Sequence, residues 1–210
     1  MLATHQLRYR FHATKAEFTF PDITCEFGQA VLIFGPSGCG KSTFLHLLAG
    51  LLKPSSGNII IGQKEIQSLS PKELDQFRAK HIGLVLQKPH FLNALNVLEN
   101  LLLFQSLSGR RKDEKTIFDI LETLDLADKM MQMPYALSQG EAQRLSLARA
   151  VMNQPKVILA DEPSSSLDDI RTQNVAELLI DQAQKTGAAL VVVSHDSRLK
   201  DLFNVKIQFS

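Results

Sequence analysis

One short segment, Gly35-Pro36-Ser37-Gly38-Cys39-Gly40-Lys41-Ser42, constrains the fold of this 210-residue chain most. It matches the pattern G-x-x-x-x-G-K-[ST], follows an apolar run at 31–34 and precedes a helical apolar pattern at 42–52. In this setting glycines let backbone N–H groups and a helix N-terminus face phosphate groups. We therefore expect a nucleotide site in which Lys41 reaches the β- and γ-phosphates, Ser42 binds Mg²⁺ and Thr43 lies beside them.

Further apolar runs predict buried strands. They lie at 58–62, 82–86, 157–160 and 190–193. Because these runs do not alternate with polar residues, both faces of the sheet should be covered, which favours a layered α/β fold. Residues 88–153 show an almost wholly helical pattern, broken by a polar loop at 108–113.

Two carboxylates, Asp161 and Glu162, follow the apolar run at 157–160. Ligands of parallel sheets gather at the carboxyl ends of strands, so both side chains should lie near the bound phosphates. Asp161 suits a Mg²⁺ ligand and Glu162 a general base that polarises the attacking water. A pair of solvated acids at a strand end is the alternative.

Composition narrows the class of protein. Apolar residues make up 44% and charged residues 21%, and the net charge of +1 does not favour nucleic acid as a partner. No apolar run approaches the roughly 20 residues that span a bilayer, and no secretory signal begins the chain. The two cysteines, Cys25 and Cys39, suit a reducing compartment. We expect a cytoplasmic protein, and no C-terminal regulatory domain, since only residues 196–210 follow His195.

Several motifs together resemble the ABC ATPase family over essentially the whole chain. They are the signature-like Leu137-Ser138-Gln139-Gly140-Glu141, Gln87 after a strand, Ser164-Ser165-Ser166-Leu167-Asp168 after Glu162-Pro163, and His195 after a strand. The resemblance implies one ABC ATPase domain over residues 1–210. It would have a P-loop NTPase core at about 1–87 and 154–210, with a parallel sheet and an antiparallel β edge, and an α-helical subdomain at about 88–153.

The resemblance also implies roles for single residues. Ser138, placed as the N-cap of a helix over 139–152, would grip the γ-phosphate bound to a partner subunit together with Gln139, Gly140 and Glu141, although an ordinary helix cap is the alternative. His195 would contact the γ-phosphate and Gln87 the Mg²⁺ ion or the lytic water. Asp168 would line the subunit interface.

Two positions are less typical of the family, and the adenine site has two candidates. Gln139 stands where the family commonly has glycine, and Ser164 replaces the usual threonine. Phe11 is the first choice for stacking on adenine, with Tyr9 as the alternative, because alternation along a strand puts both rings on one face.

Three segments are similar to the macrolide-efflux and lipoprotein-release branch. They are 73–87, 96–100 and 158–163. Membership would make the chain an ATP-hydrolysing motor subunit that pairs head to tail, as a homodimer or an ABC-type heterodimer, around two Mg-ATP. It would drive an integral membrane permease through the region Gln87–Leu95, from the inner face of the cell membrane. A non-hydrolysing ATP sensor and a non-transport ABC ATPase are the alternative functions.

Overall fold

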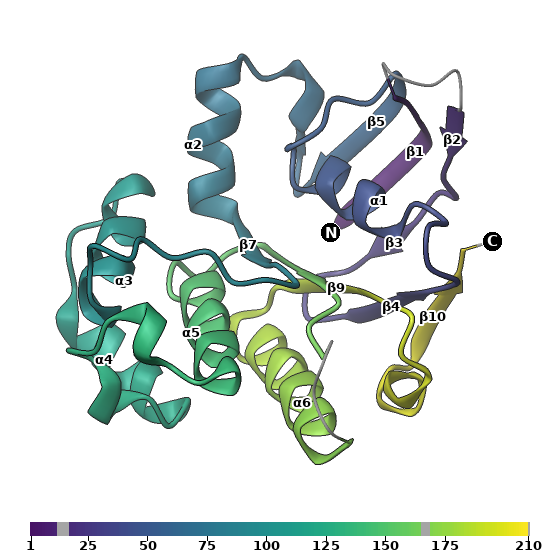
Figure 1. Ribbon diagram of the computed structural model, residues 1–210. Coiled ribbons are helices and arrows are strands. Elements are labelled where there is room, and N and C mark those ends of the chain that lie inside the picture. Colours follow the sequence, from purple (N-terminus) through teal and green to yellow (C-terminus); the bar gives the residue numbers. More distant parts are fainter. Residues whose placement is uncertain (12–16, 165–168, 210) are drawn as a thin grey trace.

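Two separate sheets, one antiparallel and one parallel, organise the computed structural model (Figure 1). The structure describes residues 1–11, 17–164 and 169–209, without the side chains of 169–171. The antiparallel sheet has the order β2-β1-β5-β6, and β3 also pairs with β1. Its strands are β1 (Leu2–Arg10), β2 (Glu17–Thr19), β3 (Thr24–Cys25), β5 (Ser56–Ile61) and β6 (Lys64–Glu65).

The parallel sheet has the order β10-β4-β9-β8-β7. Its strands are β4 (Ala30–Phe34), β7 (Ile82–Val85), β8 (Val157–Asp161), β9 (Ala189–Ser194) and β10 (Val205–Gln208). Alternate side chains of β8 enter two different hydrophobic cores, Ile158 and Ala160 one and Val157 and Leu159 the other. Both faces of the sheet are therefore covered, as the unbroken apolar runs predict.

Six α-helices complete the described chain. They are α1 (Lys41–Leu48), α2 (Pro71–His81), α3 (Val97–Leu107), α4 (Glu114–Thr123), α5 (Gln139–Val151) and α6 (Asp169–Thr186), with short 3₁₀ helices at Ile66–Ser68, Ala127–Lys129, Pro134–Ala136 and Ser197–Leu202. Helix α1 lies between the two sheets, and α5 and α6 cover the other face of the parallel sheet (Figure 1). Helices α3 and α4 lie farther out, at one side of the molecule.

Helix α5 packs directly on β7. A Cβ added to Gly83 of β7 would lie 2.2 Å from the carbonyl oxygen of Ala150 in α5. Only glycine permits this approach, so the helix and the strand are in backbone contact. Strand β7 and helix α5 therefore form one packed unit.

Two predicted helices are wrong in extent. Helix α1 ends at Leu48 rather than at residue 52, because the N–H groups of Leu51 and Leu52 turn back to the carbonyl oxygen of His46. Residues 86–96 are not helical, although the pattern predicted helix from 88. The buried amide of Asn100 instead organises this segment, accepting from Leu92 N at 2.9 Å and donating to the carbonyl oxygens of Leu92, Leu95 and Asn96. Division of the chain into a core and a helical subdomain at 88–153 stays a prediction.

Candidate active site

The glycine-rich loop joins the end of β4 to the start of α1, as predicted. Gly40, the N-cap of α1, has φ 96°, a left-handed conformation that favours glycine. Lys41 is buried, and its Nζ donates to the carbonyl oxygens of Gly35 and Pro36 at 2.9 and 2.8 Å. The ammonium group is therefore held by the loop itself, with Cys39 Sγ as a further neighbour at 4.0 Å. Ser37, Gly38 and Cys39 belong to the same loop, and Thr43 lies in the first turn of α1.

Ser42 and Asp161, the two residues predicted to bind Mg²⁺ through the loop and the strand end, lie next to each other. The Ser42 hydroxyl donates to Asp161 Oδ1 at 3.0 Å, joining the first turn of α1 to the end of β8. Burial raises the pKa of Asp161, opposed by the Ser42 hydroxyl and by His46, while Glu162 adds to the rise. A buried carboxylate and a hydroxyl thus lie together at the start of α1. This donor set fits Mg²⁺, which takes oxygen ligands.

Glu162 is held by the end of β9. Its backbone has φ 45°, and its N–H donates to the carbonyl oxygen of Val193 at 2.9 Å. One carboxylate oxygen accepts from Ser194 Oγ at 2.7 Å, and the other accepts from His195 N at 3.0 Å and lies 2.7 Å from His195 Nδ1. A left-handed glutamate is costly, so these contacts hold the residue in its conformation.

A cavity of about 510 Å³ opens beside this carboxylate. It is lined by Gln87, Glu162, Ser164, His195, Asp196, Ser197 and Arg198. The three residues that the sequence assigned to water and phosphate chemistry, Gln87, Glu162 and His195, therefore lie around one space. The side chain of His195 is 61% exposed, whereas that of Glu162 is 11% exposed. The carboxylate is thus enclosed, whereas most of the ring is open to solvent.

The signature-like segment forms the cap of α5. Ser138 is the N-cap, and a capping box joins its side chain to Glu141 N and the Glu141 carboxylate to Ser138 N. Hydrogen bonds from Ser138 lower the pKa of Glu141. Among the described residues no hydrogen bond or ion pair links residues 137–141 to the loop at 35–43; Lys129 is the ion-pair partner of Glu141, at 3.8 Å. Helix α5 instead reaches the acidic strand end through Gln143, whose amide donates to the Pro163 carbonyl oxygen at 3.1 Å.

Aromatic rings gather beside the loop. Phe11 contacts Tyr9 and Phe18 edge-on, with ring centroids 4.9 and 5.8 Å apart. Phe11 is 37% exposed, while Tyr9 packs partly buried against the core. A Cβ on Gly40 would lie 2.9 Å from Phe18, so Phe18 touches the loop itself. The choice of Phe11 for adenine stays a prediction, and Phe18 is a neighbour that the sequence did not indicate.

Some functional neighbours escaped the sequence analysis. Ser194 and Asp196 flank His195, and the Ser164 hydroxyl donates to Asp196 Oδ2 at 3.2 Å. The pattern Ser-x-x-Glu at 138–141 was a readable signal for the capping box. No local signal marked Ser194. The predicted interface residue Asp168 lies outside the described residues.

Comparison with known proteins decides the family. The model of the family described as ABC transporter matches residues 20–165, well over half of the chain. The chain belongs to the ABC transporter family. Its cassette is an ATP-binding ATPase, and its branch is the one that the sequence resembled.

Two relatives place this ABC cassette within the family. The lipoprotein-releasing system ATP-binding protein LolD of Legionella pneumophila (strain Lens) is 40% identical over 182 residues, 86% of this chain and 80% of the relative. The macrolide export ATP-binding/permease protein MacB of Rhodopirellula baltica is 38% identical over 181 residues, 84% of this chain and 26% of that larger protein.

Solved ABC cassettes share the fold. The dimeric structure of the bacterial ABC transporter cassette MJ0796 has a TM-score of 0.88 at 28% identity and covers 99% of this chain and 94% of its own. The same cassette in a post-hydrolysis state bound to ADP and Pi has a TM-score of 0.90, also at 28% identity, over 100% and 94% of the two chains. The predicted α/β fold with parallel and antiparallel strands is confirmed, with the antiparallel strands forming a sheet of their own. None of the helices in the described ranges combines the length and apolar character that a bilayer crossing needs.

Proposed function

We propose that this ABC ATPase is the motor subunit of a membrane complex. Two copies, or this chain and a related cassette, close head to tail around two Mg-ATP. The observation that carries the proposal is the meeting of two pairs, Ser42 with Asp161 and Glu162 with His195, at the carboxyl ends of β8 and β9. Binding groups and reacting groups thus share one edge of the parallel sheet.

Each predicted site residue has a role in this scheme. Lys41 and the N–H groups of the loop bind the phosphates, and Ser42, Asp161 and Gln87 would hold Mg²⁺, which neutralises charge on the phosphate oxygens. Glu162 accepts the proton of the attacking water. His195 stabilises negative charge on the γ-phosphate.

The remaining site residues serve binding and pairing. Phe11 stacks on the adenine ring. The cap of α5 at Ser138–Glu141 binds the γ-phosphate of the opposite copy through its free N–H groups, and Asp168 lines the interface between the copies. Among the described residues no hydrogen bond or ion pair joins the cap to its own loop at 35–43, and a site completed by a second copy is consistent with that separation.

The decisive test is the Glu162→Gln variant. Removal of the base should lower kcat by about 10²–10⁴-fold while ATP still binds. Light scattering should then show the molar mass rising from 23.4 kDa to that of a dimer with Mg-ATP, but not with Mg-ADP. Wild-type kcat in this variant would refute the role of Glu162. A monomer under every nucleotide would refute closure of this chain on itself.

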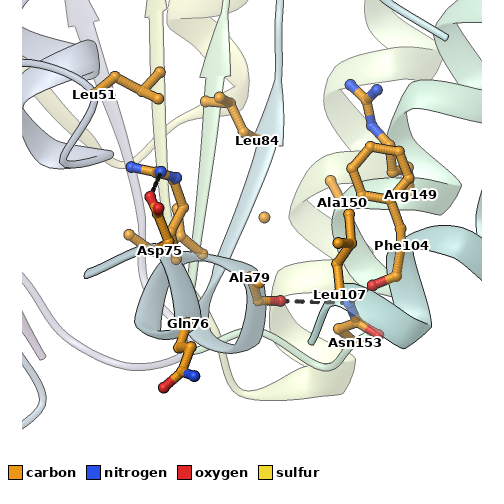
Figure 2. A pocket seen from close by; sticks show the side chains of 13 residues that line it. Leu51, Asp75, Gln76, Ala79, Leu84, Phe104, Leu107, Arg149, Ala150 and Asn153 are labelled. Carbon is orange, nitrogen blue, oxygen red and sulfur yellow. Dashed lines mark hydrogen bonds and ion pairs between the residues drawn. The ribbon is translucent and has the colours of Figure 1, made fainter. Parts of the chain in front are cut away.

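We infer that the membrane subunit docks at a second cavity, of about 570 Å³ (Figure 2). It opens between α2 and the pair α3 and α5, with Asp75 and Gln76 on one side and Phe104 and Arg149 on the other. Arg149 lies over the rings of Phe91 and Phe104, at 5.0 and 4.9 Å from their centroids. Its only hydrogen-bond acceptor among the described residues is the carbonyl oxygen of His90.

The positive charge of Arg149 at this cavity favours a partner that carries a carboxylate. Burial lowers the pKa of Arg149 to about 10, and no carboxylate within the described residues pairs with it. The buried Oδ1 of Asn153, which also lines this cavity, accepts no hydrogen bond from the part of the chain that the structure describes. An amphipathic cytoplasmic helix of a permease, with a carboxylate for Arg149, would complete both groups. Since His90 and Phe91 belong to the predicted contact Gln87–Leu95, the helix would reach that segment too, from the cytoplasmic face of the membrane.

Replacing one arginine tests this contact. Arg149→Met should abolish co-purification of the chain with an integral membrane permease from detergent-solubilised membranes, while ATP binding persists. Arg110→Met, in the exposed loop 108–113, is the matched control and should retain the permease. Equal retention by both variants would place the permease contact elsewhere.

A further inference from the structure

We propose that Ser194 is a positioning residue for ATP hydrolysis. Its buried hydroxyl fixes the carboxylate of Glu162 in the orientation that accepts a proton from water. This inference rests on the proposed role of Glu162 as general base, and adds to it a residue outside the motifs that the sequence revealed.

The hydroxyl of Ser194 both donates and accepts a hydrogen bond. Ser194 ends β9 and is completely buried. Its oxygen accepts from Asp196 N at 3.1 Å, and its hydrogen is donated to Glu162 Oε2 at 2.7 Å. Because the backbone N–H of Asp196 can only donate, it leaves the hydroxyl hydrogen to point at Glu162.

The carboxylate needs this contact because its other oxygen is held separately. Glu162 Oε1 is bound by His195 N and the His195 ring, so Ser194 is the one described donor on Oε2. The terminal torsion of a glutamate is broad, and a carboxylate held at one oxygen alone can rotate. Two fixed donors on two oxygens remove that freedom.

The contact of Ser194 with Glu162 also differs from that of the His195 ring, because it persists during the proposed reaction. The His195 ring, 61% exposed, leaves Glu162 when it turns to the phosphate in the proposed reaction. The Ser194 hydroxyl lies at the buried end of β9, and the His195 N–H is a backbone group, so neither has to turn with the ring. The orientation of the base is therefore preserved during the step that uses it.

The test is Ser194→Ala against a matched control. Ser194→Ala should lower kcat about tenfold, less than loss of the base itself, with KM for ATP unchanged. Ser194→Thr keeps the hydroxyl and should restore kcat; Ser194→Cys, with a weak donor, should give an intermediate rate. Ser146→Ala removes an equally buried hydroxyl that has no hydrogen-bond partner among the described residues, and should leave kcat at the wild-type value.

A second experiment, in a chain that carries Glu162→Ala, distinguishes failure of this inference from failure of the proposed function. In a Glu162→Ala chain, Ser194→Ala should cause no further fall in the single-turnover rate, because Ser194 acts through the missing carboxylate. An equal fall in both backgrounds, a raised KM, or a kcat of Ser194→Ala equal to that of Ser146→Ala would overturn the inference while leaving Glu162 as the base. Wild-type kcat in Glu162→Ala would overturn both.

Discussion

Cys25 and Cys39 show how far two residues of one type can differ. Cys25 is completely buried, and burial raises the pKa of its thiol to about 12. Cys39 is partly exposed inside the phosphate loop, 4.0 Å from Lys41 Nζ. The reactive form of a cysteine is the thiolate, so the two side chains should respond differently to an alkylating reagent.

We expect N-ethylmaleimide at neutral pH to modify Cys39 and spare Cys25, and ATP to block the modification. The added group would fill the space of the phosphates, so the labelled chain should lose ATP binding. Intact-mass spectrometry and fluorescent-nucleotide titration measure the two effects, with Cys39→Ala as the unlabelled control. A labelled chain that binds ATP with wild-type affinity would disprove the placement of Cys39.

Residues inside local motifs were predictable, and residues that act across strands were not. Ser42 and Asp161 each follow a readable strand, so their meeting at 3.0 Å could be expected. The contact of Ser194 with Glu162 depends on β9 lying beside β8, where Val193 is opposite Asp161. A serine that ends an apolar strand carries no sign of that neighbour. The contact of Phe18 with Gly40 likewise depends on the packing of segments that are distant in sequence.

Among the helices, three begin with the same device. Capping boxes join Ser70 to Glu73, Asn96 to Glu99 and Ser138 to Glu141. Each satisfies N–H groups that a helix start leaves without partners. At α5 the box also fixes the direction in which the proposed phosphate-binding N–H groups point.

The box at α5 predicts a pH dependence of stability. Because hydrogen bonds from Ser138 lower the pKa of Glu141 below its usual 4.5, the charged side chain stabilises the fold above that pH. The stabilisation is lost as the pH falls through the lower, folded-state pKa. We expect wild type to melt above Glu141→Gln at neutral pH, and the difference in Tm to close on acidification. Calorimetry of both chains from pH 7 to about pH 3 measures it; a constant difference would contradict the prediction.

Element boundaries were the weakest part of the sequence analysis. Helix 42–52 was too long because apolar periodicity continues through Leu51 and Leu52, while the helix ends at Leu48 and these two N–H groups bond back to His46. The helical prediction at 88–96 failed because one buried amide, Asn100, satisfies the backbone of a loop. The periodic pattern shows only which residues are apolar. Neither the end of α1 nor the loop held by Asn100 alters that pattern.

For the whole molecule, the separation of the α5 cap from the phosphate loop predicts complementation. Lys41→Ala disables the loop, and Gly140→Asp puts a negative charge at the cap. A Cβ at Gly140 meets only Arg144 Nη1, at 3.8 Å, so the second variant should fold. Each variant alone should be inactive. Mixed, they form pairs in which one copy's intact loop meets the other's intact cap, and phosphate release should return.

The mixture needs two controls. Each variant at doubled concentration should stay inactive, and a mixture of Lys41→Ala with a Lys41→Ala, Gly140→Asp double variant should also stay inactive. Absence of any recovery in the first mixture, with both variants folded, would show that the cap does not act across chains.

The amide of Asn100 sets a limit on how cassettes of this kind can diverge. Its four hydrogen bonds reach residues 92, 95 and 96. They therefore constrain the length of that loop as well as its shape. An insertion there would strand buried polar groups, whereas the exposed residues at 109–112 could accept added residues at a lower cost. Over evolutionary time, length changes should accumulate at the outer turn, and the loop after Gln87 should keep its residue count even where its letters change.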